Sequence, residues 1–286
     1  MNSMTESNYH LYLELMKKSL LASIYDENGW YVLGSLDRKN PRSLRYWIKF
    51  AAVKLAWTCG FVIVKPTTGN EISGWGLFCY TMISLARLSN IQFCVEDILK
   101  NNVEGDFIET GVWRGGATIF MRAILKANGI SDRVVWVADS FEGLPQSKKY
   151  DEDITIMNDG GPMRLALAVS LERVKQGFAK FDLLDDQVNF IKGWFRDTLP
   201  RAPIEKLALL RLDGDLYDST MDALNALYGK VTKGGYVIVD DYNRWPQCKE
   251  AIDDFRSARG IRDEMVNIDD DAVFWKVSEE PSVDRL

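Results

Sequence analysis

From residue 106 onward, short apolar segments alternate with helical segments, and this alternation constrains the fold of the chain most strongly. Strands that alternate with helices form βαβ units, which build a parallel sheet covered by helices on both faces. Five strands are expected in this part, and two more close the chain. The expected strands cover residues 106–110, 134–138, 188–191, 207–212, 236–239, 264–268 and 272–277. The sequence therefore predicts a doubly wound α/β domain with a mostly parallel seven-stranded sheet.

Helices are expected between these strands and before them. Those between the strands cover residues 115–128, 163–177, 219–230 and 247–258, and those before them cover 8–24, 43–58, 76–88 and 93–101. The stretch Lys65–Asn70 is rich in turn residues, and we interpret it as a hinge. We expect a helical N-terminal extension at residues 1–92, with a possible lid role, and a core domain at residues 93–286.

Composition excludes several classes of protein. The chain has 286 residues, 47% of them hydrophobic, which is ample for a buried core. Its net charge is -6 and its Lys and Arg residues are scattered, whereas a nucleic-acid-binding protein normally carries a basic patch or stripe. The four cysteines form no CxxC pair, so neither a zinc site nor a disulfide framework is expected: Cys59, Cys79, Cys94 and Cys248.

No segment has the pattern of a membrane span or a signal peptide. The most apolar stretch, Leu55–Val64, is short of the roughly 20 residues that a spanning helix needs. Glu6 and Glu14 interrupt the N-terminal region, which argues against a cleaved signal. We therefore expect a cytoplasmic protein without stable membrane insertion, and leave open a looser membrane or partner contact by the apolar stretch.

The turn after the first expected strand has three glycines and begins with an acidic residue. Glycines at 111, 115 and 116 let the backbone turn sharply and approach a ligand closely. Glu109 would repel a cofactor phosphate but suits the cationic amino group of a methionine moiety. The negative charge of Glu109 therefore favours S-adenosylmethionine over a dinucleotide. We assign Glu109, Thr110 and Gly111 to the cofactor. The alternative is a glycine-rich turn that serves packing alone.

Two further strand ends support a cofactor site. Asp139 ends the second expected strand, where a carboxylate can accept hydrogen bonds from both ribose hydroxyls. We assign the following Ser140 and Phe141 to the same site. After the third strand, Gly193 and Trp194 offer a glycine and an apolar surface to bound an adenine ring, although Trp194 suits the core equally well.

Four carboxylates follow the next two strands. Asp213 and Asp215 come after residues 207–212, and Asp240 and Asp241 after residues 236–239. Parallel strands end at the same edge of a sheet, so these side chains should converge, and crowded carboxylates need a cation to neutralise them. Oxygen ligands without Cys or His select a hard ion, which indicates Mg²⁺, Mn²⁺ or Ca²⁺. Separate helix caps and surface turns are the alternative.

A bound Mg²⁺ would suit methyl transfer to a hydroxyl group. An alcohol is a weak nucleophile, and a coordinated Mg²⁺ lowers its pKa so that a carboxylate can take the proton. The single histidine, His10, is far from these motifs in sequence. We assign Asp213, Asp240 and Asp241 to the metal and Asp215 to the base, with the division of roles among them left open.

Several long motifs of the chain resemble the macrocin O-methyltransferase (TylF/MycF) family. They are Tyr12–Lys18, Thr81–Ile83, Glu109–Gly116, Asp139–Pro145, Leu212–Tyr217 and Gly235–Tyr242. The resemblance implies a class I, Rossmann-like methyltransferase fold, with Thr81 and Met82 at the cofactor. It also implies methylation of sugar hydroxyls on natural products, with Mg²⁺ held by Asp213, Asp240 and Asp241 and with Asp215 as base. A homo-oligomer formed through the N-terminal helices is a further expectation.

The acceptor is less constrained, because residues 38–75 are longer and more hydrophobic than the family pattern suggests. A catechol-type enzyme is one alternative, in which Arg211 or Lys249 would replace the lysine expected near the metal. A non-catalytic cofactor-binding scaffold is another, and an NAD-dependent oxidoreductase is disfavoured by Glu109 and the absent GxGxxG motif. The acidic run Asp269–Asp271 is expected to form a hairpin turn.

Overall fold

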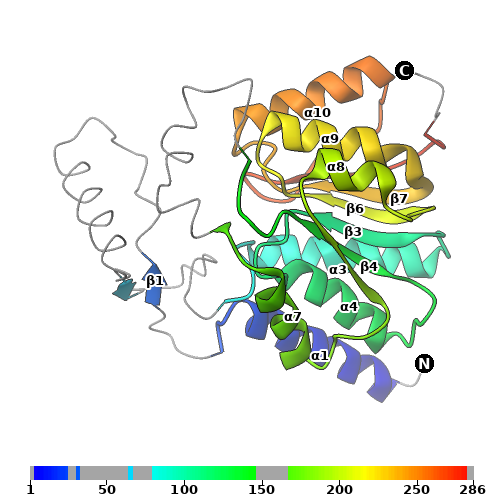
Figure 1. Ribbon diagram of the computed structural model, residues 1–286. Helices are drawn as coiled ribbons and strands as arrows, with labels where there is room; N and C mark the ends of the chain where they lie inside the picture. Colours follow the sequence, from blue (N-terminus) through cyan, green and yellow to red (C-terminus); the bar gives the residue numbers. More distant parts are fainter. Residues whose placement is uncertain (1–2, 25–29, 33–63, 67–78, 146–166, 282–286) are drawn as a thin grey trace.

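The structure is a computed structural model that describes residues 3–24, 30–32, 64–66, 79–145 and 167–281 (Figure 1). Its main sheet has seven strands in the order β5-β4-β3-β6-β7-β9-β8. These strands are β3 (Asp106–Thr110), β4 (Val135–Asp139), β5 (Val188–Lys192), β6 (Leu207–Leu212), β7 (Val231–Val239), β8 (Val266–Asn267) and β9 (Val273–Lys276). Strands β3 to β7 are parallel, and β9 pairs antiparallel with β7 and β8. The predicted α/β sheet is confirmed.

Helices cover both faces of this sheet (Figure 1). On one face lie α1 (Ser3–Leu20), α3 (Leu85–Lys100), α4 (Gly116–Ala127) and α7 (Leu171–Lys180). On the other lie α8 (Phe195–Thr198), α9 (Tyr217–Leu227) and α10 (Pro246–Arg259), with short 3-10 turns at Leu199–Arg201 and Tyr228–Lys230. Buried apolar side chains form one cluster on each side. None of the described helices is both long and apolar enough to cross a membrane.

The structure corrects the expectation of two helices at residues 76–88 and 93–101. A single helix, α3, runs without a break from Leu85 to Lys100. Its start is fixed by Ser84, whose hydroxyl accepts a hydrogen bond from the backbone N–H of Arg87 at 3.2 Å and so caps the first turn. Residues 79–84 are not helical. Asn90 falls in the expected gap, but it is buried against the core and helical.

Other boundaries also differ. Of the helix expected at 163–177, residues 163–166 lie outside the described residues, and α7 begins at Leu171, where the Ser170 hydroxyl provides the cap. Lys65 and Pro66, expected in the hinge, belong to the short strand β2 (Val64–Pro66), which pairs antiparallel with β1 (Trp30–Val32). The expected helix at 43–58 and the apolar stretch 55–64, apart from Val64, lie outside the described residues.

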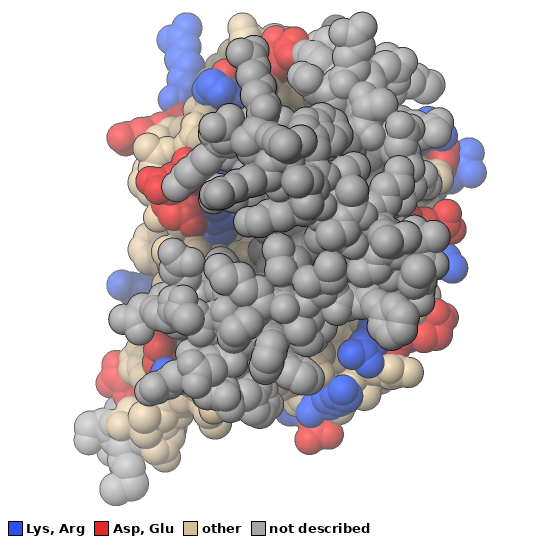
Figure 2. All heavy atoms as spheres, turned by 90° about the vertical axis from the view of Figure 1, so that its left-hand side faces the viewer, with Lys and Arg blue, Asp and Glu red and all other residues tan. Residues whose placement is uncertain are grey.

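Charged side chains of both signs lie around the margin of one face of the molecule. Figure 2 shows Lys, Arg, Asp and Glu side chains interspersed around its margin, among the residues that the structure describes. Such mixing agrees with the absence of a basic stripe in the sequence. Three cysteines, Cys79, Cys94 and Cys248, are buried and form no disulfide, and Cys59 lies outside the described residues.

The parallel strands bring their carboxyl ends into register at one edge. The backbone N–H of Asp213 donates to the Thr110 carbonyl at 2.9 Å, and that of Asp240 donates to the Leu212 carbonyl at 2.9 Å. Gly111 has a φ of +89°, and a Cβ there would lie 1.9 Å from the Asp213 carbonyl oxygen. Only glycine therefore allows the turn after β3 to pass so close to the end of β6.

Helix α1 is part of the core, which gives a test of its docking. Leu13 is fully buried, whereas Leu11 on the same helix is 66% exposed. We expect Leu13→Ala to lower the free energy of unfolding by about 2–5 kcal/mol, because it leaves a cavity. Leu11→Ala should change it by no more than about 0.5 kcal/mol. Urea denaturation of both variants measures the difference, and equal effects would contradict the docking of α1.

Candidate active site

A cavity of about 610 Å³ opens at the carboxyl edge of the sheet. It is lined by most of the residues that the sequence assigned to the site, namely Thr81, Met82, Glu109, Gly111, Asp139, Ser140, Gly193, Trp194, Asp213, Asp215, Asp240 and Asp241. Thr110 and Phe141 are not among the lining residues, and both are buried in the protein. Most of the candidate residues therefore meet around one space.

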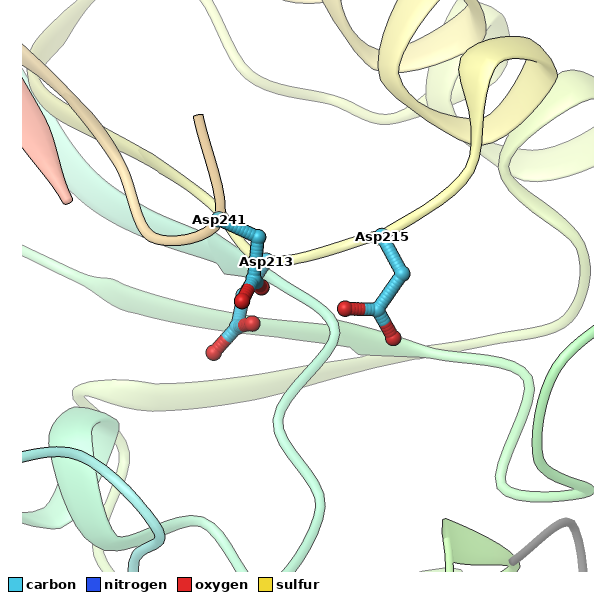
Figure 3. Close-up of side chains that lie close together, drawn as sticks. All are labelled: Asp213, Asp215 and Asp241. Carbon is cyan, nitrogen blue, oxygen red and sulfur yellow. The ribbon is translucent and has the colours of Figure 1, made fainter. Parts of the chain in front are cut away.

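Asp213, Asp215 and Asp241 form the tightest group in this cavity. Each offers a carboxylate oxygen, and these oxygens all lie within 4.8 Å of one another. Figure 3 shows the carboxylates of Asp213 and Asp241 close together, with Asp215 turned toward them from the loop after β6. Desolvation and the neighbouring Asp213 raise the pKa of Asp215 to about 7, and desolvation and Asp215 raise the pKa of Asp241 well above its usual range. A hard cation would relieve this crowding.

Asp240 is placed differently, between two arginines. Its Oδ1 accepts from Arg211, and its Oδ2 accepts from Nη1 of Arg87 at 2.6 Å. Burial raises the pKa of Asp240 to about 6, although both guanidinium groups act in the opposite direction. The predicted metal ligand Asp240 thus borders the carboxylate group but is held by ion pairs.

Arg211 joins three strands beneath the cavity. Its side chain is 1% exposed, and Nη1 donates to Glu109 and to Asp213, the latter at 2.7 Å. Arg211 also donates to Asp240. It therefore binds one carboxylate within β3 and one directly after each of β6 and β7. A charge in the interior requires such partners, because an unpaired buried ion is costly.

Glu109 keeps one oxygen free of protein partners. Its Oε1 accepts from Arg211, whereas Oε2 is buried without a hydrogen-bond partner. Burial raises the pKa of Glu109 to about 8, in spite of the attraction of Arg211. An unsatisfied carboxylate oxygen in the cavity wall is suited to a cationic ligand group.

The carboxylate of Asp139 connects two loops. It accepts from the backbone N–H of Val112 at 2.8 Å and from that of Phe141 at 2.7 Å. It therefore ties the turn after β3 to the turn after β4, and it also borders the cavity. Its contact with a ribose stays a prediction.

Two further features of the cavity were not identified from the sequence. Arg87 reaches the site from α3 and contacts residues more than 150 positions away, so no local pattern marks it. The acidic run Asp269–Asp271 does form the turn between β8 and β9, as expected, but it also lines the cavity. For Arg211 a signal existed, since a charge inside the apolar strand Leu207–Leu212 needs buried partners.

The sheet order, the glycine turn after β3 and the acidic end of β4 together define a class I, Rossmann-like methyltransferase. The chain belongs to the macrocin O-methyltransferase (TylF) family, whose family model matches residues 9–277, and it is therefore an O-methyltransferase. The resemblance seen in the sequence motifs is confirmed.

Curated relatives extend over nearly the whole chain. The demethyldecarbamoylnovobiocin O-methyltransferase of Streptomyces niveus is 44% identical over 95% of both chains. The mycinamicin III 3''-O-methyltransferase of Micromonospora griseorubida is 48% identical over 94% of this chain and 96% of its own. The solved structure of the O-methyltransferase NovP is 43% identical, covers 95% of this chain and 100% of its own, and superposes with a TM-score of 0.77. The calicheamicin methyltransferase CalS11, at 21% identity over 68% of this chain and 80% of its own, shares the fold with a TM-score of 0.53.

The buried arginine predicts a large loss of stability on substitution. Arg211→Met leaves Glu109 and Asp213 without their cation and Asp240 with Arg87 alone, so we expect the free energy of unfolding to fall by about 3–5 kcal/mol. The matched control is Arg196→Met, because the Arg196–Asp197 pair is mostly exposed and should contribute about 1 kcal/mol or less. Urea denaturation of the metal-free protein measures the free energy of unfolding of both variants. A small effect of Arg211→Met would contradict the network.

Proposed function

We propose that the protein transfers a methyl group from S-adenosylmethionine to a sugar hydroxyl of a glycosylated natural product, with the assistance of Mg²⁺. The observation that carries this proposal is the group of carboxylates from β6 and β7 beside a cavity that also contains Glu109 and Asp139. The names of the relatives supply the acceptor class, since they act on novobiocin and mycinamicin precursors.

The cavity residues fit S-adenosylmethionine in charge. The unpartnered Oε2 of Glu109 is suited to the ammonium group of the methionine part. Asp139, at the end of β4, is the candidate for the ribose hydroxyls, and Gly193 and Trp194 for the adenine. We further assign Thr81, Met82, Gly111 and Ser140 to this cofactor, together with Thr110 and Phe141, which are buried next to lining residues.

The carboxylates likewise fit a hard divalent ion. We propose Asp213, Asp240 and Asp241 as ligands of Mg²⁺, since each oxygen of Asp240 keeps a second lone pair beside its arginine bond. When bound, such an ion lowers the pKa of a coordinated hydroxyl and fixes its orientation. Asp215 is the candidate for accepting the hydroxyl proton, because its carboxylate is directed toward the oxygens of Asp213 and Asp241, where a coordinated hydroxyl would lie (Figure 3).

The positions of Lys249 and Arg211 favour a sugar acceptor over a catechol. Lys249 does not line the cavity, and it contacts Asp253 at 3.3 Å and the Tyr242 hydroxyl at 2.6 Å. Arg211 is committed to three carboxylates. Neither residue is therefore placed to serve as the lysine of a catechol enzyme.

Location and assembly are parts of the same proposal. We expect the enzyme to act in the cytoplasm on small glycosides rather than on nucleic acid or membrane. We also expect it to form a homo-oligomer through the helical extension at residues 1–92, with the catalytic domain at 93–286. Size-exclusion chromatography with light scattering measures the oligomeric state.

The central experiment is a methyl-transfer assay with and without Mg²⁺. Purified protein is given S-adenosylmethionine with demethyldecarbamoylnovobiocin or mycinamicin III, the precursors named for its relatives. We expect a mass gain of one methyl group that EDTA abolishes and Mg²⁺ restores. Asp213→Asn should lower kcat by at least about a hundredfold, because it removes a metal ligand, with little change in S-adenosylmethionine affinity.

The matched control is Asp132→Asn, since Asp132 is exposed, precedes the amino end of β4 and does not line the cavity. Its rate should equal that of the unchanged protein. Full activity of Asp213→Asn, or activity insensitive to EDTA, would contradict the metal site. Methylation of a catechol but of neither glycoside would favour the alternative substrate class.

A further inference from the structure

Arg87 lies between the metal-site carboxylates and the β8–β9 turn. Its side chain is 11% exposed. Nη1 donates to Asp240 at 2.6 Å, Nε donates to Asp269 at 2.8 Å, and Nη2 reaches Asp269 at 3.1 Å and Asp271 at 3.2 Å. The Ser84 hydroxyl, which caps α3, donates to the same Asp269 at 2.9 Å. One guanidinium thus connects the first turn of α3, the end of β7 and the acidic turn.

Asp240 contacts two arginines, Arg211 and Arg87. Arg211 takes one of its oxygens and Arg87 the other, so the carboxylate is already neutralised on both sides. The neighbouring group of Asp213, Asp215 and Asp241 lies in the same cavity as Arg87. A divalent ion that binds this group therefore meets a fixed positive charge and shares Asp240 with it.

Two effects of Arg87 on ion binding have opposite signs. As a cation it repels the ion, and this repulsion is strong in a partly buried site, where the effective dielectric constant is low. As a hydrogen-bond donor it orients Asp240, which would assist binding. Arg211 continues to orient Asp240 when Arg87 is removed, because it binds the other oxygen. The repulsion should therefore outweigh the orientation.

We propose that Arg87 is a resident counter-cation that competes with the divalent ion for Asp240 and thereby limits the affinity of the metal site. This inference rests on the proposed metal site of Asp213, Asp240 and Asp241. Asp269 and Asp271 keep the guanidinium in place, since three of its contacts go to the turn. Arg87 is thus a positioning residue that acts through Asp240, and the acidic turn sets where its charge lies.

Calorimetric titration of the full chain with MgCl₂ alone tests the inference. Removing the charge in Arg87→Met should tighten Mg²⁺ binding by about tenfold, because the repulsion is lost. Arg87→Lys keeps the charge, so its affinity should stay within about threefold of the unchanged protein. The matched control is Arg122→Met, which breaks the ion pair of the buried Arg122 with the exposed Asp185, away from the cavity. Its Mg²⁺ affinity should not change.

A second substitution leaves the arginine in place and has the opposite expected sign. Asp269→Asn removes the main partner of Arg87, so more of its charge is directed at Asp240, and Mg²⁺ binding should weaken by about threefold. Asp270→Asn removes a neighbouring charge of the same turn without touching the network, and its effect should be smaller. Circular dichroism confirms that each variant is folded before titration.

The outcomes separate this inference from the proposed function. Unchanged or weaker Mg²⁺ binding by folded Arg87→Met overturns the role of Arg87, even when the unchanged protein binds Mg²⁺ and transfers methyl groups. Equal effects of Asp269→Asn and Asp270→Asn overturn the part given to the turn. If the unchanged protein binds no Mg²⁺, the metal site is refuted and the inference with it.

Discussion

The guanidinium of Arg211 is the interaction on which the carboxyl edge of the sheet depends. It is almost fully buried and binds Glu109, Asp213 and Asp240, which belong to three adjacent strands. Without a cation at this point, the three carboxylates would repel one another in a region of low dielectric constant. The parallel sheet can therefore end in a cluster of acids because β6 carries one buried arginine.

The same network divides the site into two chemical parts. Glu109 gives one oxygen to Arg211 and leaves the other unpartnered, and this second oxygen is the one we propose for the ammonium group of the methyl donor. Asp213 accepts a hydrogen bond from Arg211. It also belongs to the carboxylate group with Asp215 and Asp241, which we propose as the site of a divalent ion. A single arginine thus orients acidic groups toward both the proposed cofactor and the proposed metal, and Arg87 adds a second cation from the opposite side.

The sequence predicted the parts of the fold that depend on local pattern. Strands at 106–110 and 207–212 begin and end as expected, because their apolar runs are bounded by polar residues. The start of β7 was missed, since Thr232–Gly235 has the composition of a loop and Gly234 adopts a φ of +87° within the strand. Strand-end carboxylates were predictable because parallel strands share an edge. The role of Arg87 was not, because its partners Asp240 and Asp269 lie 153 and 182 residues away.

The most direct test of this account is an anomalous diffraction map of crystals grown with MnCl₂ and S-adenosylhomocysteine. Mn²⁺ takes the oxygen ligands that suit Mg²⁺ and scatters anomalously. We predict one strong peak in contact with the carboxylates of Asp213 and Asp241, next to a cofactor whose amino group meets Glu109. A peak elsewhere, or an ordered cofactor with no metal beside these carboxylates, would contradict the account.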